Sequence, residues 1–134
     1  MIVVDASAII AILTDESESA LLVAALDQAG GATTTPIAIY EATLGVRRKR
    51  RSGVTQAERA VMEFLRLARI VVQPIQPETA HLALEAFDRY GKGRGHPARL
   101  NLGDCFMYAQ AKAGGASLLY KGDDFSKTDI EGAS

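Results

Sequence analysis

A chain of 134 residues with a formal net charge of −1 fits one domain and has no overall charge that would draw it to nucleic acid or an acidic membrane. Its single cysteine, Cys105, excludes an intrachain disulfide. No apolar run has the length of a membrane span or the flanks of a signal peptide, so a cytoplasmic protein with no membrane segment is expected.

Short apolar runs alternate with longer helical stretches along the chain. Strands are predicted at Ile2–Val4, Ala32–Thr35, Ile70–Ile75 and Ser117–Tyr120. Helices are predicted at Ala6–Thr14, Ser17–Ala29, Pro36–Arg51, Thr55–Arg69, Pro77–Tyr90 and Leu102–Ala113. This alternation predicts an α/β fold, a three-layer sandwich with a mostly parallel central sheet flanked by helices, as a single domain over residues 1–134.

Local signals support several of these boundaries. Pro36 suits the first turn of a helix, and Thr55 followed by Glu58 predicts a capping box. The segment 91–99 has the Gly and Pro content of a loop that leads into the last long helix. We find neither an internal repeat nor a second domain.

Four acidic residues lie far apart in the chain but at equivalent places in this predicted fold. Asp5 and Asp123 follow strands, Glu41 lies in the second turn of a helix, and Asp104 lies in the first turn of another. The carboxyl ends of parallel strands and the amino ends of the following helices share one edge of a sheet, where ligands bind. The four carboxylates are therefore expected to converge.

Each aspartate also has an ordinary structural explanation. Asp5 can cap the helix that begins at Ala6, Asp104 is favoured by the helix dipole, and Asp123 with Asp124 fits a turn after a strand. Helix caps occupy the same edge in any parallel sheet. The three aspartates alone therefore leave both interpretations open.

Glu41 favours a functional site, because Ile37 and Leu44 place it on an apolar stripe of its helix. An unpaired carboxylate is costly there, and several in one pocket repel one another. A divalent cation with oxygen ligands reverses both penalties. Ser7, two residues after Asp5, can support such a site by donating a hydrogen bond, although it also suits a helix start.

The other candidate ligands point away from zinc or thiol chemistry. His81 and His96 lack zinc-ligand spacing with each other or with Cys105. Cys105 lies in an apolar run, where a buried inert thiol is expected.

Positive charge is concentrated in residues 47–51, a run of arginine and lysine at the end of a predicted helix. A solvated helix end explains most of the run, since cations complement the helix dipole. The alternative is phosphate contact by Arg47 and Arg48, with Arg94, Arg99 and Lys121 adding charge near the acidic edge. No aromatic residues interleave with these cations, so base stacking is not indicated as a main binding mode.

Ordered blocks of residues give the chain a resemblance to the PIN-domain nucleases, specifically the VapC toxin ribonucleases of type II toxin–antitoxin pairs. The blocks are residues 1–8 (MIVVDASA), Glu41-Ala42, residues 96–105 (HPARLNLGDC), Tyr108 to Lys112, and residues 118–129 (LLYKGDDFSKTD). Together they span nearly the whole chain.

The resemblance implies a magnesium- or manganese-dependent endoribonuclease in which Asp5, Glu41 and Asp104 are the acids at the metal. Asp5 and Asp104 are the expected direct ligands. A fourth acid follows the last strand, and Asp123 is assigned because it comes first after Gly122, with Asp124 as the alternative. The expected partners are an RNA substrate, a cognate antitoxin protein and a second copy of the chain in a homodimer.

Two other functions fit the residues without the resemblance. One is phosphoryl transfer through an aspartyl-phosphate at Asp5 with help from Lys121, although that chemistry usually has a second acid where Ser7 stands. The other is a catalytically silent module whose acidic pocket receives an arginine from a partner.

Overall fold

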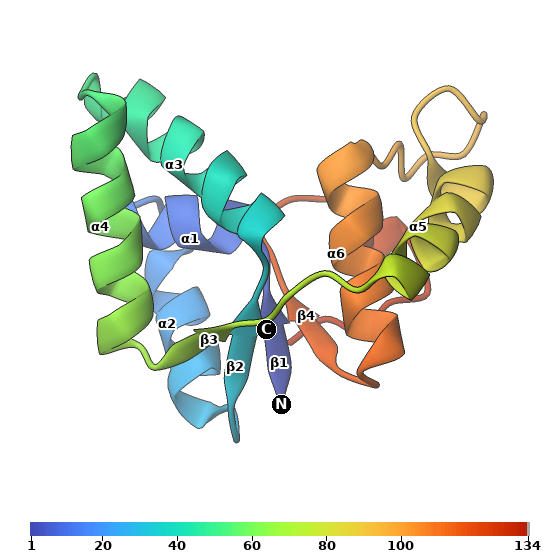
Figure 1. Ribbon diagram of the computed structural model, residues 1–134, viewed down its shortest axis with the longest axis horizontal. Coiled ribbons are helices and arrows are strands. Elements are labelled where there is room, and N and C mark those ends of the chain that lie inside the picture. The colour runs from blue at the N-terminus through green and yellow to red at the C-terminus, as the bar shows by residue number, and fades with distance from the viewer. Residues whose placement is uncertain (134) are drawn as a thin grey trace.

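A computed structural model, which describes residues 1–133, shows a four-stranded parallel sheet flanked by six helices (Figure 1). The strands are β1 (Ile2–Val4), β2 (Ala32–Thr34), β3 (Ile70–Val72) and β4 (Ser117–Leu119), in the order β3-β2-β1-β4. All three pairings are parallel, and Ile2 is in register with Ala32 on one side and Ser117 on the other. The predicted α/β class is confirmed.

The helices are α1 (Ala6–Leu13), α2 (Ser19–Gln28), α3 (Pro36–Arg50), α4 (Val54–Leu67), α5 (Pro77–Tyr90) and α6 (Leu102–Ala113). A short 3-10 turn, η1 (Phe125–Lys127), follows β4. Each predicted helix is present, and boundaries differ by a few residues at most. None of the helices within residues 1–133 has the length and apolarity needed to cross a membrane.

Two local predictions were wrong for identifiable reasons. β3 ends at Val72 instead of Ile75, because Gln73 makes the last backbone bond to Thr34 (2.8 Å) and Pro74, which has no N–H, follows. Helix α4 begins at Val54, before the predicted capping box. Its cap is Gly53, whose N–H donates to the side chain of Gln56 (3.3 Å), so Thr55 lies inside the first turn.

Small residues let the helices approach one another closely. A Cβ at Gly45 in α3 would lie 2.3 Å from Cδ1 of Ile10 in α1, so the two helices touch where a larger residue would not fit. Ala38, Ala42 and Val46 of the same helix are fully buried. This packing joins α1 and α3 into one unit behind the acidic residues that they carry.

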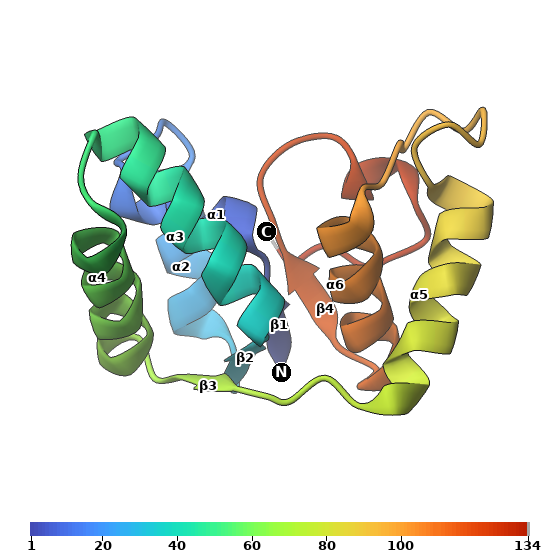
Figure 2. The same ribbon diagram turned by 45° about the horizontal axis from the view of Figure 1, so that its top comes forward.

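The strand order creates a switch point beside β1. The chain leaves β1 toward β2 and β3, whereas β4 returns to pair on the other side of β1. Helices α1 to α4 gather on one side of the view and α5 and α6 on the other, so α3 and α6 lie on opposite sides of the end of β1 (Figures 1 and 2). Ligand sites of parallel sheets form at such points.

Candidate active site

Asp5 lies at the end of β1 and is only 4% exposed. Its side chain caps α1: Oδ2 accepts hydrogen bonds from the N–H (3.0 Å) and the hydroxyl (2.5 Å) of Ser7. Its own N–H donates to the carbonyl of Leu119 at the end of β4 (2.9 Å). Asp5 is therefore a helix cap, and that role holds it at the switch point.

Ser7 connects Asp5 to the segment that follows β4. While its hydroxyl donates to Asp5, its Oγ accepts a hydrogen bond from the backbone N–H of Lys121 (3.0 Å). The serine thus joins the first and last strands of the chain through side-chain chemistry. This link holds the start of the segment after β4 beside Asp5.

Glu41 reaches the site from the second turn of α3. The helix starts at Thr35, a fully buried cap whose Oγ1 accepts from the N–H of Ala38 (3.1 Å) and donates to Sδ of Met107 in α6 (3.4 Å). The half-buried carboxylate of Glu41 lies against Gly103: a Cβ there would fall 2.3 Å and 2.4 Å from its two oxygens. Gly103 therefore leaves the space that Glu41 occupies.

Asp104 lies in the first turn of α6, one residue after that glycine. Its N–H donates to Oδ1 of Asn101 (2.9 Å), and its Oδ2 accepts from the N–H of Asn101 (3.1 Å). This reciprocal capping box holds the aspartate at the start of the helix. The capping explanation is correct here too, and it places the carboxylate beside the space into which Glu41 projects.

The pKa values of all three acids are raised. Burial is the main cause for Asp5. Burial and then the charge of Asp5 raise the pKa of Glu41. Burial raises the pKa of Asp104 to about 7, with further contributions from the charges of Asp5, Asp124 and Glu41. Three distant parts of the chain thus bring carboxylates within electrostatic reach of one another.

The chemistry of these carboxylates suits a divalent ion, but in this structure they do not lie close enough together to hold one. Carboxylate oxygens are the ligands that Mg²⁺ and Mn²⁺ prefer, and a cation would relieve the mutual repulsion. Within residues 1–133, however, no three His, Cys, Asp or Glu side chains form a group tight enough to hold a metal. Asp5 and Asp104 are turned to their capping partners, so binding an ion requires the carboxylates to move closer together.

Asp123 was assigned as the fourth acid from the sequence, with Asp124 as the alternative, and the two residues lie in different surroundings. The charge that acts on Asp104 belongs to Asp124, which also lines a hollow with Asn101. Asp123 and Asp124 are both exposed, and the carbonyl of Asp123 accepts a hydrogen bond from the hydroxyl of Ser126 (2.7 Å) as the chain enters η1. The charge that acts on Asp104 and the shared hollow therefore favour Asp124, the alternative that the sequence left open.

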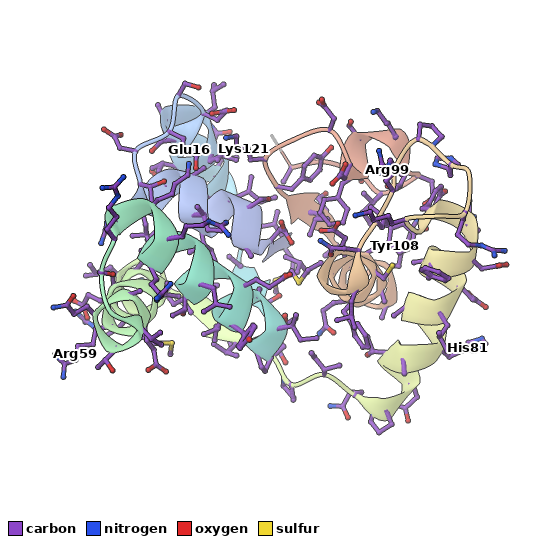
Figure 3. The ribbon with its side chains drawn as sticks, turned by 90° about the horizontal axis from the view of Figure 1, so that it is seen from above. Glu16, Arg59, His81, Arg99, Tyr108 and Lys121 are labelled. Carbon is purple, nitrogen blue, oxygen red and sulfur yellow. The ribbon has the colours of Figure 1, made fainter. Side chains whose placement is uncertain are left out.

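Two of the predicted RNA-contacting cations are engaged by acids of the chain. Lys121 forms ion pairs with Glu16 and, at 3.8 Å, with Glu18. Figure 3 shows Glu16 and Lys121 side by side, away from Arg99. Arg94 pairs with Asp88 (2.9 Å). Among these three predicted cations, Arg99 alone faces the hollow that Asp124 lines.

The basic run at the end of α3 is partly structural. Lys49 pairs with Glu16 (2.5 Å), and Arg50 donates to the carbonyl of Leu13 (2.5 Å) at the end of α1. Arg47 and Arg48 are exposed in the last turn. The helix-end interpretation therefore accounts for part of the run, and RNA contact by Arg47 and Arg48 stays a prediction.

The remaining reactive groups have structural roles. Cys105 is a buried free thiol, and burial with the charge of Asp104 raises its pKa to about 11, so it is inert at neutral pH. His81 pairs with Glu85 (3.0 Å) on an exposed face. His96 packs edge-on against Tyr90, with ring centroids 4.9 Å apart.

Comparison with known proteins gives a consistent result. The PIN domain family matches residues 2–131. A VapC ribonuclease of Rhizobium meliloti is 41% identical over 138 residues, covering 95% of this chain and 97% of the relative. Ribonuclease VapC42 of Mycobacterium tuberculosis is 38% identical, with 98% of each chain covered.

A solved structure supports the fold independently of close sequence identity. The crystal structure of Mycobacterium tuberculosis VapC20, described as a Sarcin-Ricin loop cleaving toxin, superposes with a TM-score of 0.76 at 17% identity. The match covers 97% of this chain and 96% of that one. At this identity the likeness establishes the shared fold and nothing finer.

Proposed function

This chain belongs to the PIN domain family, among its VapC ribonucleases, and on that basis we propose that it is a toxin endoribonuclease that needs Mg²⁺ or Mn²⁺. The acids of its site are Asp5, Glu41, Asp104 and Asp124. Asp124 takes the place that the sequence analysis gave to Asp123.

The observation that carries the proposal is the meeting of three buried or half-buried carboxylates whose pKa values are raised. Groups with raised pKa values, gathered at a switch point, are typical of functional sites. The nearby Lys121 pairs with Glu16 and Glu18, so it does not neutralise the charge of the three site carboxylates. The site therefore has the composition of a receptor for an external cation.

Each residue of the site has a defined task in this proposal. Asp5 and Asp104 are the direct ligands of the ion, and Glu41 and Asp124 complete its negative surroundings. Ser7 orients Asp5 through its two hydrogen bonds, while Asn101 orients Asp104. The bound ion would lower the pKa of a water molecule and neutralise charge that develops on the phosphate.

The pKa of Asp104 also makes ion binding depend on pH. Without a cation, Asp104 has a pKa of about 7 and is partly protonated at neutral pH. Ion binding needs its carboxylate form, so binding at pH 7 releases a proton. Cleavage should therefore rise with pH as Asp104 ionises.

Neither alternative function is favoured by the structure. Asp5 is buried with a raised pKa, which disfavours its use as a phosphate-accepting nucleophile. A silent pocket that receives an arginine would use the same acids, but it predicts no turnover. The cleavage assay separates this alternative from the enzyme.

The proposal extends to partners and location. A cognate antitoxin protein and an RNA substrate follow from membership among the VapC ribonucleases, and we expect the activity in the cytoplasm, where cellular RNA is accessible. A homodimer stays a prediction from the sequence resemblance. The particular RNA is open to a transcriptome-wide map of cut ends.

The test is cleavage of total RNA by purified protein in a titration of Mg²⁺ and of Mn²⁺, with EDTA as the metal-free control. We expect cleavage that requires the ion and that is abolished in Asp5→Asn and Asp104→Asn, with melting curves showing that both variants fold. Full activity in both variants, or equal activity in EDTA, would refute the proposal.

A further inference from the structure

The active site has a neighbouring hollow that carries positive charge. It has a volume of about 290 Å³ and is lined by Lys92, Arg99, Asn101 and Asp124. We propose that Lys92 and Arg99 bind the RNA backbone phosphate next to the one that is cleaved. This inference rests on the proposed ribonuclease function, and it assigns a phosphate-binding subsite to the loop between α5 and α6.

The hollow adjoins the acids through two shared residues. Asn101 caps the helix that carries Asp104, and the charge of Asp124 reaches Asp104. A strand of RNA whose scissile phosphate lies at the acids has its next phosphate a single nucleotide away. That neighbouring phosphate is the one that the hollow would bind.

The two cations lie at the hydrogen-bonded base of the loop. Lys92 donates its backbone N–H to the carbonyl of Leu100 (2.8 Å), and Leu100 donates to the carbonyl of Tyr90 (2.8 Å). These bonds close the stem of the loop beside Lys92 and Arg99. The glycines at positions 93 and 95, which have φ values of +88° and +80°, lie in the tip beyond it. The backbone of Lys92 is held by one of these bonds and Arg99 directly precedes Leu100, which limits the entropy lost on binding.

The charges of Lys92 and Arg99 are not neutralised by the chain. Neither residue forms an ion pair within 4.0 Å among residues 1–133, although Asp124 lines the same hollow. In contrast, Arg94 in the tip of the same loop pairs with Asp88. One loop thus contains two available cations and one engaged cation, which supplies a matched control.

Phosphate is the ligand that best suits this arrangement. An arginine guanidinium offers a planar pair of donors to phosphate oxygens, and a lysine adds a point charge. The mixture of cations with Asn101 also allows a hydrogen bond to a phosphate or to a ribose hydroxyl. An apolar occupant would leave these polar groups unpaired.

RNA binding measured without cleavage tests the subsite. The parent is Asp5→Asn, and its affinity for a fluorescein-labelled single-stranded RNA is followed by anisotropy across a KCl series. Arg99→Gln and Lys92→Gln should each lower the slope of log affinity against log salt by about 0.7, the value for one phosphate contact on a single strand. Arg94→Gln should leave the slope unchanged.

Two further measurements guard against a purely structural effect. Arg99→Lys, which keeps the charge, should restore most of the slope. In the cleaving protein, Arg99→Gln should raise KM several-fold while kcat changes less. Melting curves establish that each variant is folded.

The possible failures are distinguishable. Unchanged slopes for both Gln variants, with RNA still cleaved by the wild type, would overturn the subsite and leave the ribonuclease proposal standing. An equal loss in Arg94→Gln would also overturn it, because general charge would then explain the binding. An acidic peptide serves as a second probe. If the two Gln variants bind RNA as the parent does but lose binding to this peptide, the subsite is overturned and the hollow is assigned to a protein partner. Absence of both RNA binding and cleavage would refute both proposals.

Discussion

Two groups of charged side chains sit at the same end of the sheet in opposite electrostatic states. In one group, the carboxylate of Glu16 forms ion pairs with Lys49 and Lys121, and these two lysines lower the pKa of Glu16 to about 2. In the other, burial, with a further contribution from the charges of neighbouring carboxylates, raises the pKa of Asp104 to about 7. The first group, the Glu16 cluster, is neutralised by the chain itself, whereas the second, the acid site, is left without a cation.

The difference separates structural from functional charge. The Glu16 cluster joins the turn after α1, the end of α3 and the segment after β4, so its pairing stabilises the fold. In the acid site, Asp5 and Asp104 cap helices, but no cation of the chain pairs with the carboxylates, which are buried and repel one another. An external cation would relieve that repulsion, and the following predictions test this contrast.

The largest effect is expected from Asp104→Asn, which removes a proposed metal ligand. Loss of even an outer partner of a metal ligand costs about 10–100-fold in activity, so loss of a ligand should cost at least about 100-fold. The thermal midpoint in EDTA should stay level or rise, because one repelling charge is gone. A large loss of stability would mean that the acid site is structural after all.

Gly103→Ala should have the next largest effect, because the added Cβ would collide with the carboxylate of Glu41. We expect a loss of roughly 10–100-fold in activity, comparable with disturbing the support of a metal ligand. Calorimetry with Mn²⁺ should show weaker ion binding.

Gly114→Ala is the matched control at the other end of the same helix. There the nearest atom to an added Cβ lies 3.6 Å away, an ordinary contact, and φ is −89°. Activity near that of the wild type in Gly103→Ala would show that Glu41 is not needed at this position.

The two groups should also impose opposite pH dependence on stability. Asp104 keeps its proton in the folded state up to a pKa of about 7 but loses it near 3.8 when unfolded, so the stability of metal-free protein falls as pH rises through that window. Glu16 has a folded pKa of about 2 against 4.5 when unfolded, so its contribution is lost as pH falls from 4.5 toward 2.

Thermal midpoints measured from pH 2 to 8 in EDTA check both trends. Asp104→Asn should flatten the decline toward neutral pH, and Glu16→Gln should flatten the decline in acid. If Asp104→Asn instead changes the decline in acid, or Glu16→Gln the decline toward neutral pH, the assignment of the two groups is wrong.

The smallest effect is expected from Glu16→Gln, which removes the acid that the two lysines share. Charge pairs of limited exposure contribute about 1 kcal/mol, so a modest fall in the free energy of unfolding should appear in denaturant titrations. Activity should fall only a few-fold, through looser placement of the segment that carries Asp124. Glu63→Gln, which breaks an exposed pair with Arg66, should leave the unfolding midpoint unchanged.

The sequence was sufficient for the fold class and for the placement of Asp5, Glu41 and Asp104. The alternation of strands and helices sets which ends share an edge, and the capping propensities of Asp5 and Asp104 place them there. Glu41 was recognisable because a carboxylate on an apolar stripe needs a reason.

Other features depend on pairings between residues that are distant in the chain. Lys121 was predicted as a possible RNA contact, yet it pairs with Glu16, and a separation of 105 positions along the chain leaves no local signal for that pair. The choice of Asp124 over Asp123 depends on how η1 turns the backbone. Lys92 and Gly103 were missed because their importance lies in what stands opposite them, not in their neighbours along the sequence.

The central claim is that the acid site binds a divalent cation, and a crystal soaked in Mn²⁺ and measured for anomalous scattering tests it most directly. We predict an anomalous peak between the carboxylates of Asp5 and Asp104, with both side chains drawn together and no peak at the Glu16 cluster. A fully soaked crystal with no peak at these aspartates would contradict the account.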